Sequence, residues 1–452
     1  MMKKARKTAL ALVTGAATVG LVLTGCAPSG GGDGGTTSDA ITDEQREEAL
    51  NTPTDLTFWT WVPDIENEVA LFEEKYPAIN VTVENVGQGL EHYQKLRSAL
   101  EAGEGAPDVA QVEYQYIPSF VLTESLLDLT PYGADDIADD YVGWAWNQVS
   151  PNEEVWAVPQ DVGPMGNLYR EDILSEAGIT EAPETWDDYA AAAKAVKDET
   201  GSYISNLGAT QAGQMIGFMW QAGVQPFTYD GAETVGIDVN NDTAKEVANY
   251  WTELIQQDLI SVDTDFSDQW YQGLANGKYA GWLTAAWGPI FLQGTAESTS
   301  GLWRAAPLPQ WSAGEQVSGN WGGSSDAVLA TSENPIAAYE LAKFINHDEE
   351  SAMKLATEQF LYPPQLSVLE NPEFIDQESE FYGGQQVNKL FADISETVDT
   401  DFQWVPFMEY VYSTYEETIG SVVAEKGDIA AALDEWQDQL VSYAEDQGFT
   451  VE

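Results

Sequence analysis

The chain has 452 residues, 43% of them hydrophobic and 11% aromatic, and its 75 acidic against 18 basic residues give a formal net charge of −57. That length exceeds what one ordinary core needs, so we expect two domains or lobes. So acidic a protein repels nucleic acid and anionic lipid headgroups, which excludes both as partners and favours a neutral or cationic ligand.

Residues 1–25 have the pattern of a signal peptide. The basic stretch KKARK precedes an uncharged run, TALALVTGAATVGLVLTG, that is short and rich in Gly, Thr and Ala for a membrane-spanning helix. The run ends in LTGC, which resembles the bacterial lipobox, and Cys26 is the only cysteine of the chain. We therefore expect Cys26 to carry the lipid anchor, with a secretory signal without lipid as the alternative, and no internal disulfide.

Residues 26–53 follow as a linker. Its Gly/Ser-rich part predicts a flexible tether with a reach on the order of 30 Å, enough to hold a domain off a membrane. The stretch TDEQREEAL near its end is compatible with a short helix.

The next sixty residues alternate between strand and helix patterns. A strand is predicted at 55–61, and a helix with apolar residues at helical spacing follows and stops at Pro77. INVTVENV predicts the second strand, a helix begins near Leu90, and PDVAQV predicts the third strand. This β-α-β-α-β order predicts a parallel sheet with right-handed crossovers, and hence an α/β fold.

Helices dominate the second half. Thr185 and Asp188 predict a capping box for a helix that ends at Gly201. A final helix is predicted between a cap at Asp428 and an exit at Gly448, with Trp436 on its apolar stripe as a core residue. Further helices are predicted at 213–222, 243–257 and 334–346.

Most catalytic signatures are missing from the sequence. It contains no HExxH, Walker A, GxSxG or CxxC motif, and its two histidines, His92 and His347, are far apart. We therefore expect no metal, no cofactor and no enzymatic activity. With 75 acidic residues, pairs of carboxylates are too common to argue for or against a glycoside hydrolase.

The tryptophans carry more information. There are sixteen, and several adjoin turns or loops, although each alone is more often a core residue. Aromatic planes stack on the apolar faces of sugars, and Asp, Glu, Asn and Gln bind their hydroxyls, so this recurrence favours a carbohydrate ligand. Those at loop edges are Trp59, Trp61, Trp220, Trp270, Trp287, Trp311, Trp321 and Trp404.

An ordered set of segments resembles the family 1 extracellular solute-binding proteins of carbohydrate ABC importers, relatives of the maltodextrin-binding protein. After the lipobox come LTFWTWV, GAPDVAQVEYQYIPSF, VWAVPQDVGPMGNLYREDILSEAGI, ANGKYAGWLTAAWGP and NWGGSSDAVLATSENPIAAYELAKFI. The resemblance implies a two-lobed periplasmic-binding-protein fold, type II-like, whose hinged lobes are joined by crossing segments near 162–167, 318–322 and 392–400. It also implies an N-terminal lobe of 54–164 plus 322–392 and a C-terminal lobe of 165–321 plus 393–452.

The resemblance also implies a ligand site between the lobes. On the N-terminal lobe it places Glu113, Tyr114 and Gln115, with Trp59 or Trp61, and at the first crossing it places Gln160 and Asp161. Trp220, Trp270, Trp287 and Trp404 line the second lobe, and Trp321 and Gly322 lie at the second crossing. The loop VEYQY departs from the maltodextrin-binding relative in its charged residues, which argues against maltodextrin.

We therefore expect a bacterial, monomeric, lipid-anchored receptor on the outer face of the cytoplasmic membrane, which passes a neutral oligosaccharide to an ABC permease. Two alternatives stay open at this point. One is a surface glycoside hydrolase with the same aromatic subsites, and the other is a binding protein for a cationic solute, which the negative charge would suit.

Overall fold

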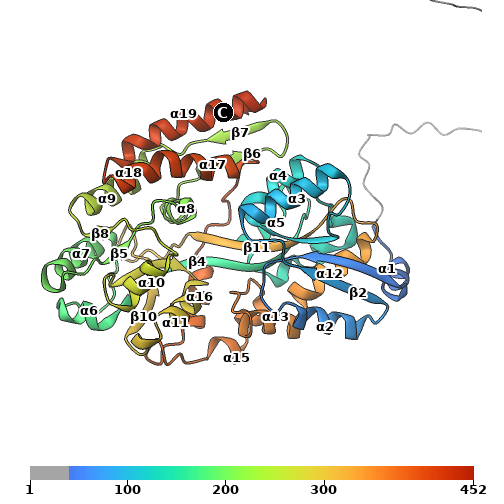
Figure 1. Ribbon diagram of the computed structural model, residues 1–452, viewed down its shortest axis with the longest axis horizontal. Coiled ribbons are helices and arrows are strands. Elements are labelled where there is room, and N and C mark those ends of the chain that lie inside the picture. Colours follow the sequence, from blue (N-terminus) through green and yellow to red (C-terminus); the bar gives the residue numbers. More distant parts are fainter. Residues whose placement is uncertain (1–39) are drawn as a thin grey trace, which may run out of the picture. The chain divides into compact units, whose positions relative to one another are not determined.

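The computed structural model describes residues 40–452, so the expected signal peptide, Cys26 and the first part of the linker lie outside the described residues. The described part has two lobes joined by long strands (Figure 1). The first lobe contains α1 (Asp43–Asn51), β1 (Thr54–Trp59), α2 (Glu66–Lys75), β2 (Ile79–Glu84), α3 (Leu90–Ala102), β3 (Val109–Glu113), η1 (Tyr114–Tyr116), α4 (Ile117–Leu122), η2 (Thr130–Tyr132), η3 (Ala134–Asp140), α5 (Gly143–Val149), η4 (Pro151–Glu153), α12 (Pro335–His347), α13 (Glu349–Thr357), α14 (Leu366–Leu369) and α15 (Pro372–Ile375).

The second lobe is mostly helical. Its elements are α6 (Glu171–Glu176), α7 (Trp186–Thr200), β5 (Ser205–Asn206), α8 (Ala212–Gln221), β6 (Phe227–Tyr229), β7 (Thr234–Ile237), α9 (Asp242–Gln256), β8 (Ile260–Ser261), α10 (Asp268–Ala275), β9 (Gly281–Ala285), α11 (Gly288–Thr295), η5 (Glu297–Thr299), β10 (Trp303–Pro307), α16 (Val387–Ser395), α17 (Met408–Tyr415), η6 (Glu416–Gly420), α18 (Ser421–Ala424), α19 (Ile429–Gln447) and β12 (Thr450–Val451).

Two strands connect the lobes. β4 (Val158–Arg170) and β11 (Asn320–Val328) pair with each other. β11 also pairs with β3 in the first lobe, and β4 continues into the second lobe, where it pairs with β9 and β10. The strand order in this sheet is β10-β4-β11-β3-β1-β2, with β9 also on β4. These strands coincide with the crossings expected near 162–167 and 318–322, and the two-lobed α/β prediction is confirmed.

The parallel order predicted for the first lobe is confirmed by the register. β1 pairs in parallel with β2 from Thr54 opposite Ile79, and with β3 from Phe58 opposite Val109. The carboxyl ends of β1 and β3 therefore meet at one edge of the sheet.

The helix ends follow the predicted capping residues. Thr185 and Asp188 form the capping box of α7, and Gly201 ends that helix in the left-handed conformation. The side chain of Asp428 accepts from the backbone N–H of Ala431 at the start of α19, and Trp436 in that helix is fully buried.

The short helix with which TDEQREEAL is compatible, near the end of the linker, is present as α1. Thr42 forms a capping box with Gln45, and α1 packs against α12. Arg46 donates to the carbonyl oxygen of Tyr132 and forms an ion pair with Glu340. These contacts attach the end of the expected linker to the first lobe, while its Gly/Ser-rich part lies outside the described residues.

The expected lobe boundary at 392 and 393 falls inside α16. Phe391 of this helix lies directly over Gly166, in the part of β4 that pairs with β9 and β10. The exact limits of the lobes stay a prediction.

Gly163 lets the two crossing strands approach closely. A Cβ at this position would lie 2.0 Å from the carbonyl oxygen of Trp321 and 3.1 Å from the Cβ of Ala285. We expect Gly163→Ala to lower the free energy of unfolding by roughly 2–3 kcal/mol, because backbone atoms of β11 would have to move. Thermal unfolding of wild type and Gly163→Ala measures this loss of stability. Gly294→Ala is the control, since a Cβ there would meet nothing within 4 Å apart from its own stretch of helix α11. Equal melting temperatures for the two variants would refute the expectation.

Candidate functional site: the groove at the strand crossing

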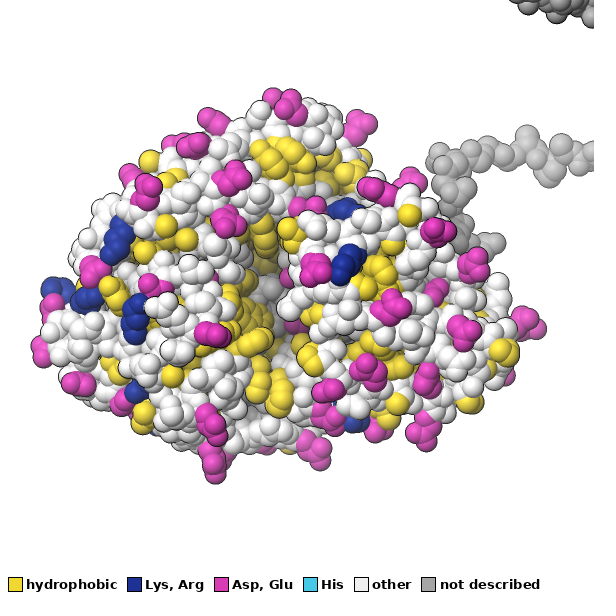
Figure 2. All heavy atoms as spheres, viewed as in Figure 1, with side chains coloured by type: hydrophobic (Ala, Val, Ile, Leu, Met, Phe, Trp, Pro, Cys, Tyr) yellow, Lys and Arg dark blue, Asp and Glu magenta, His cyan; other side chains and the backbone are white. Residues whose placement is uncertain are grey.

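A groove separates the two lobes at the point where the paired strands β4 and β11 pass from one lobe to the other. Figure 2 shows the face hollowed between them, with hydrophobic side chains along the hollow. The carboxyl ends of β1 and β3 reach this edge of the sheet, where open α/β sheets bind their ligands. Within residues 40–452, no helix is long and apolar enough to cross a membrane, and no cluster of His, Cys, Asp and Glu could hold a metal ion.

Two of the expected acids are aligned across three neighbouring strands. Ser324 of β11 stands opposite Glu113 of β3 and also opposite Asp161 of β4. Asp161 accepts from the backbone N–H of Ser324 (2.9 Å) and from its hydroxyl. Paired residues of adjacent strands project to the same side of a sheet, so both carboxyls lie on one face beside the crossing.

Burial raises the pKa of both carboxyls. That of Asp161 is about 6, although the two hydrogen bonds from Ser324 oppose the shift. That of Glu113 is about 7, because burial and the nearby charge of Asp161 outweigh the hydrogen bonds from Tyr93 and Gln115. Both acids are held in an environment where an accepted hydrogen bond is stronger than in water.

A polar network continues from Ser324 into the first lobe. Its hydroxyl accepts from Nε2 of Gln111 (2.8 Å), and Oε1 of Gln111 accepts from the hydroxyl of Thr60 and from the backbone N–H of Trp61. Gln160 donates to Oδ2 of the fully buried Asp326 (2.9 Å). The network therefore fixes the loop that carries Trp61 relative to the crossing strands.

The loop after β3 packs against the crossing. The hydroxyl of Tyr114 donates to the carbonyl oxygen of Asp161 (2.9 Å), and both Tyr114 and Gln115 are buried. Gly323 has φ +100°, and a Cβ there would lie 2.7 Å from the ring of Tyr114, so only glycine fits. A Cβ at Gly322 would be 3.4 Å from Nε1 of Trp287. Tyr114 and Gly322 thus shape the floor of the groove.

One aromatic group lies on the first lobe, and we call it the N-lobe group: Trp59, Trp61, His92 and Tyr93. Trp59 is buried and donates through Nε1 to Glu84 (2.9 Å), whereas Trp61 is half-buried. The buried His92 lies edge-on to Trp61 at 5.0 Å, and burial lowers its pKa to about 4. A neutral imidazole therefore braces Trp61, which keeps part of its ring free.

A second group, the crossing group, lies on the other wall. Trp287 donates through Nε1 to the carbonyl oxygen of Trp321 (2.8 Å), and the two rings meet edge-to-face at 5.0 Å. Phe266 lies 6.1 Å from each of them. Trp287 is half-buried, and Phe266 and Phe291 are 38% and 49% exposed. The group also contains Trp270 and Trp282, which are buried beneath these rings.

Trp220 and Trp404 belong to a third group. Trp220 stacks on Phe402 at 3.9 Å with 10° between the planes, and it is 1% exposed. Trp404 is buried, donates to Oε1 of Gln148 (2.6 Å) and lines a cavity of about 470 Å³ that Trp156 also lines. Because other rings cover their faces in this conformation, neither Trp220 nor the buried Trp270 presents an open stacking surface.

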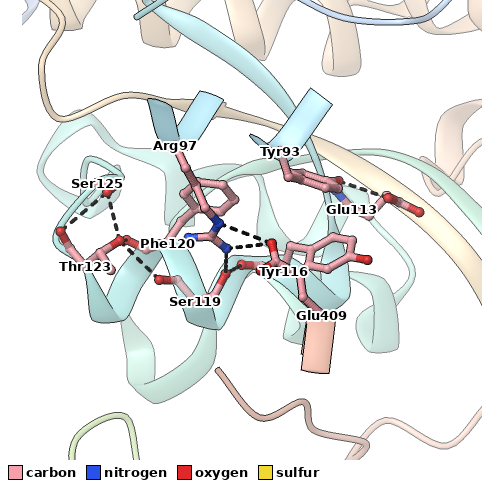
Figure 3. A network of polar contacts seen from close by, with 9 residues as sticks. All are labelled: Tyr93, Arg97, Glu113, Tyr116, Ser119, Phe120, Thr123, Ser125 and Glu409. Carbon is pink, nitrogen blue, oxygen red and sulfur yellow. Dashed lines mark hydrogen bonds and ion pairs between the residues drawn. The ribbon is translucent and has the colours of Figure 1, made fainter. Parts of the chain in front are cut away.

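An ion pair is among the contacts that join the two lobes directly. Arg97 of α3 donates to Oε1 of Glu409 in α17 through Nε (3.2 Å) and Nη2 (3.0 Å), and Nη2 also donates to Ser119 (Figure 3). The guanidinium lies 4.4 Å from the ring centre of Phe120. This ion pair spans the groove and favours the arrangement in which the lobes are close.

The expected site residues are therefore only partly brought together. Gln115 and the N-lobe group lie next to the residues that meet where β4 and β11 connect the lobes, which are Glu113, Tyr114, Gln160, Asp161, Trp287, Trp321 and Gly322. Trp220 and Trp404 lie apart from these residues, and Trp270 lies beneath the crossing group. Their role in ligand binding stays a prediction.

Sequence reasoning missed several residues at this site. Phe291 follows Trp287 by four positions at the start of α11, and that helical spacing could have revealed the pair. The ring of Tyr412 lies 6.5 Å from the ring of Tyr116 across the lobes. Burial raises the pKa of Tyr412, and the neighbouring Tyr116 and Glu113 add to this shift. Nothing in the sequence around Tyr412 indicates this position. The same holds for the inter-lobe pair of Arg97 and Glu409.

Known proteins with similar sequences are sugar-binding proteins. The chain is 26% identical over 377 residues to an arabinooligosaccharide-binding protein of Halalkalibacterium halodurans, covering 80% of this chain and 83% of that protein. It is 28% identical over 366 residues to a lactose-binding protein of Rhizobium radiobacter, covering 75% and 81%.

Solved structures agree with the two-lobed fold. An ABC-transporter-associated binding protein from B. animalis subsp. lactis Bl-04, in complex with β-1,6-galactobiose, is 31% identical with a TM-score of 0.77, over 89% of this chain and 100% of that one. The galacto-N-biose-/lacto-N-biose I-binding protein of Bifidobacterium longum is 25% identical with a TM-score of 0.77, over 88% and 98%. The model of the bacterial extracellular solute-binding protein family matches residues 58–351, and the chain belongs to that family.

Proposed function

We propose that this chain is a lipid-anchored extracytoplasmic receptor that binds a neutral oligosaccharide between its lobes and delivers it to an ABC permease. The observation that carries the proposal is the meeting of two kinds of surface at the crossing. The rings of Phe266, Trp287 and Phe291 remain partly exposed, and the carboxyls of Glu113 and Asp161 lie on the adjacent sheet edge.

The two surfaces match the two faces of a sugar. Aromatic planes take the apolar C–H face, and buried carboxylates accept hydrogen bonds from hydroxyls without needing a cation. A ligand that touches both lobes has a higher affinity for the closed arrangement, and that difference in affinity shifts the population toward closure. The resulting complex is what a permease would distinguish from the empty receptor.

The relatives suggest which sugars to test. Proteins similar to this chain bind arabino-oligosaccharides, lactose, lacto-N-biose and β-1,6-galactobiose, so the panel contains these together with maltose. We expect titration calorimetry to find at least one sugar with a micromolar or lower Kd, and tryptophan emission to change at saturation. Absence of binding to every sugar would overturn the proposal.

Two arms of the same experiment address the alternatives. Shortened products after incubation with the panel would indicate a glycoside hydrolase instead of a receptor, and we expect none. Spermidine that displaced the bound sugar, or bound when no sugar did, would indicate a receptor for a cationic solute. Gel filtration of the same sample is expected to give a monomer.

The inter-lobe ion pair gives a sharper prediction. We expect Arg97→Gln to weaken sugar binding two- to fivefold, because it removes a contact of the closed form whose side chains are about a third exposed. Glu409→Gln should do the same, and the double variant should be no weaker than either alone. Arg304→Gln is the matched control, since its partner Glu171 lies in the same lobe. Additive effects of the two substitutions would contradict a shared contact.

The lipid anchor is part of the proposal and rests on the sequence around Cys26. We expect Cys26→Ser to abolish palmitate incorporation in a bacterial host and to release the protein from the membrane fraction. Membrane retention of this variant would contradict lipidation.

A further inference from the structure

A pocket of about 330 Å³ lies between the lobes beside the crossing group, and the proposed site does not yet use it. One wall is the start of α11 in the second lobe, with Ala286, Pro289 and Ile290. The other wall is the end of α13 and the loop after it in the first lobe, including Phe360. Figure 1 shows α11 and α13 below the crossing strands, one in each lobe. The volume is at the low end of the roughly 300–1,000 Å³ typical of small-molecule sites.

On the second lobe the pocket adjoins the crossing group. Ala286 lines the pocket and directly precedes Trp287 in the chain. Helix α11 then places Phe291 edge-on to Trp287, with the ring centres 5.9 Å apart, and places Ile290 and Gln293 on the pocket. Since one helix borders both the crossing group and the pocket, the two lie side by side.

On the first lobe the loop after α13 is fixed to the groove by hydrogen bonds. Val162, which follows Asp161 in β4, donates from its backbone N–H to the carbonyl oxygen of Tyr362 (2.9 Å). The side chain of Gln359 donates to the carboxylate of Glu68 (3.3 Å) in α2, the helix that follows the loop at the carboxyl end of β1. The loop therefore contacts both the floor of the groove and its first-lobe wall, and the pocket continues the groove.

Phe360 lies between these two attachment points. It lines the pocket and is 50% exposed. Its φ is +60°, a conformation that bulky residues rarely adopt. Strain of this kind persists where the surrounding structure fixes it, and it is concentrated at ligand sites. The fold thus holds Phe360 at the pocket without burying its ring.

The remaining lining residues suit a neutral, hydroxyl-rich ligand. Of the described residues that line the pocket, one is an acid, the exposed Glu378, and none is a base, so a phosphate or carboxylate ligand would find no cation. Nε2 of Gln293 lies 3.5 Å from the hydroxyl of Ser379, and Nδ2 of Asn388 donates to the carbonyl oxygen of Phe374 (3.1 Å). The amide oxygens of Gln293 and Asn388 are acceptors that a sugar hydroxyl can use.

We propose that this pocket is a further sugar subsite, in which one unit of an oligosaccharide stacks on Phe360 while its neighbour occupies the crossing group. This rests on the proposed function and names the substrate class of that site as neutral oligosaccharides of three or more units. A disaccharide on the crossing group leaves Phe360 uncovered, whereas a longer chain buries a further apolar face on it. Longer members of one sugar series therefore bind more tightly.

The test measures the Kd as a function of chain length. Titration calorimetry uses arabino-, β-1,6-galacto- and malto-oligosaccharides of two, three and four units. The variants are Phe360→Ala and Phe360→Tyr, which keeps an aromatic ring. Leu122→Ala is the matched control, because Leu122 is another exposed hydrophobic residue of the first lobe, 44% exposed, that does not line the pocket. Thermal unfolding of each variant reports its stability.

We expect wild type to bind the trisaccharide of at least one series five times more tightly than its disaccharide. Phe360→Ala should weaken trisaccharide binding at least fivefold and leave the Kd of the disaccharide within twofold. Phe360→Tyr and Leu122→Ala should keep the wild-type preference for the longer sugar. Gln293→Ala, on the opposite wall, should weaken trisaccharide binding two- to threefold and leave disaccharide binding unchanged.

Three results would overturn this inference while the proposed function stands. They are equal affinity of wild type for both lengths, an unchanged preference in Phe360→Ala, and an equal loss for both lengths in that variant. If wild type binds none of these sugars and none of the disaccharides of the panel, the proposed function itself fails. Should Phe360→Ala not fold, Gln293→Ala decides, with an unchanged preference as the contrary result.

Discussion

Replacing Trp287 by alanine is expected to weaken sugar binding at least tenfold, about 1.4 kcal/mol of binding free energy. Trp287 precedes α11, is half-buried, and lies within 6.1 Å of Phe266, Trp321 and Phe291. Its removal takes away the central plane of the crossing group and leaves the carbonyl oxygen of Trp321 without its donor. Titration calorimetry with the best sugar of the panel measures the effect.

Two control variants separate stacking from general damage. Trp287→Phe keeps an aromatic plane but loses the N–H, so it should bind more tightly than Trp287→Ala and less tightly than wild type. Trp311→Ala removes another half-buried tryptophan of the same lobe, one that packs on Trp186 and Tyr250, and should leave the Kd unchanged. Wild-type affinity in Trp287→Ala would remove the crossing group from the binding site.

The unliganded protein is expected to be more stable at pH 5 than at pH 8. Burial raises the pKa of Asp326 to about 7, against the ordinary 3.8, and raises those of several other buried carboxyls. When a carboxyl has a higher pKa in the folded than in the unfolded protein, the folded protein binds more protons between the two pKa values. The contribution of these carboxyls to the free energy of unfolding is therefore greatest below about pH 4 and falls as the pH rises toward 7. Each pKa unit is worth about 1.4 kcal/mol, so Asp326 alone corresponds to about 4 kcal/mol.

The variant Asp326→Asn tests this assignment. Oδ2 of Asp326 accepts from Gln160 (2.9 Å) and Asn346 (2.7 Å), whereas its buried Oδ1 has no partner among the described residues. An asparagine cannot ionise, so the loss of unfolding free energy between pH 5 and pH 8, measured by urea denaturation, should shrink by a few kcal/mol. The exposed Asp376→Asn should show the wild-type slope. An unchanged slope in Asp326→Asn would show that this acid does not titrate in that range.

The fold was predictable because its signals are local. The alternation of strand and helix patterns from residue 55, the cap at Thr185 and the exit at Gly448 depend on neighbours within a few positions, and the structure confirms the elements they predict. The helix α1 was only partly anticipated, since its attachment depends on Arg46 reaching Glu340, almost three hundred residues later.

The site was predictable in kind and less so in detail. The sequence by itself determined that this acidic, tryptophan-rich chain forms two lobes of alternating strands and helices, because hydrophobic periodicity and turn chemistry act over short distances. Only the tertiary structure decided which tryptophans remain open, as Trp61 and Trp287 do, and which are covered, as Trp220 and Trp270 are. The same holds for the pairing of Arg97 with Glu409 across the lobes. Exposure and partnership depend on which distant segments the crossing strands bring together, and no local pattern encodes that.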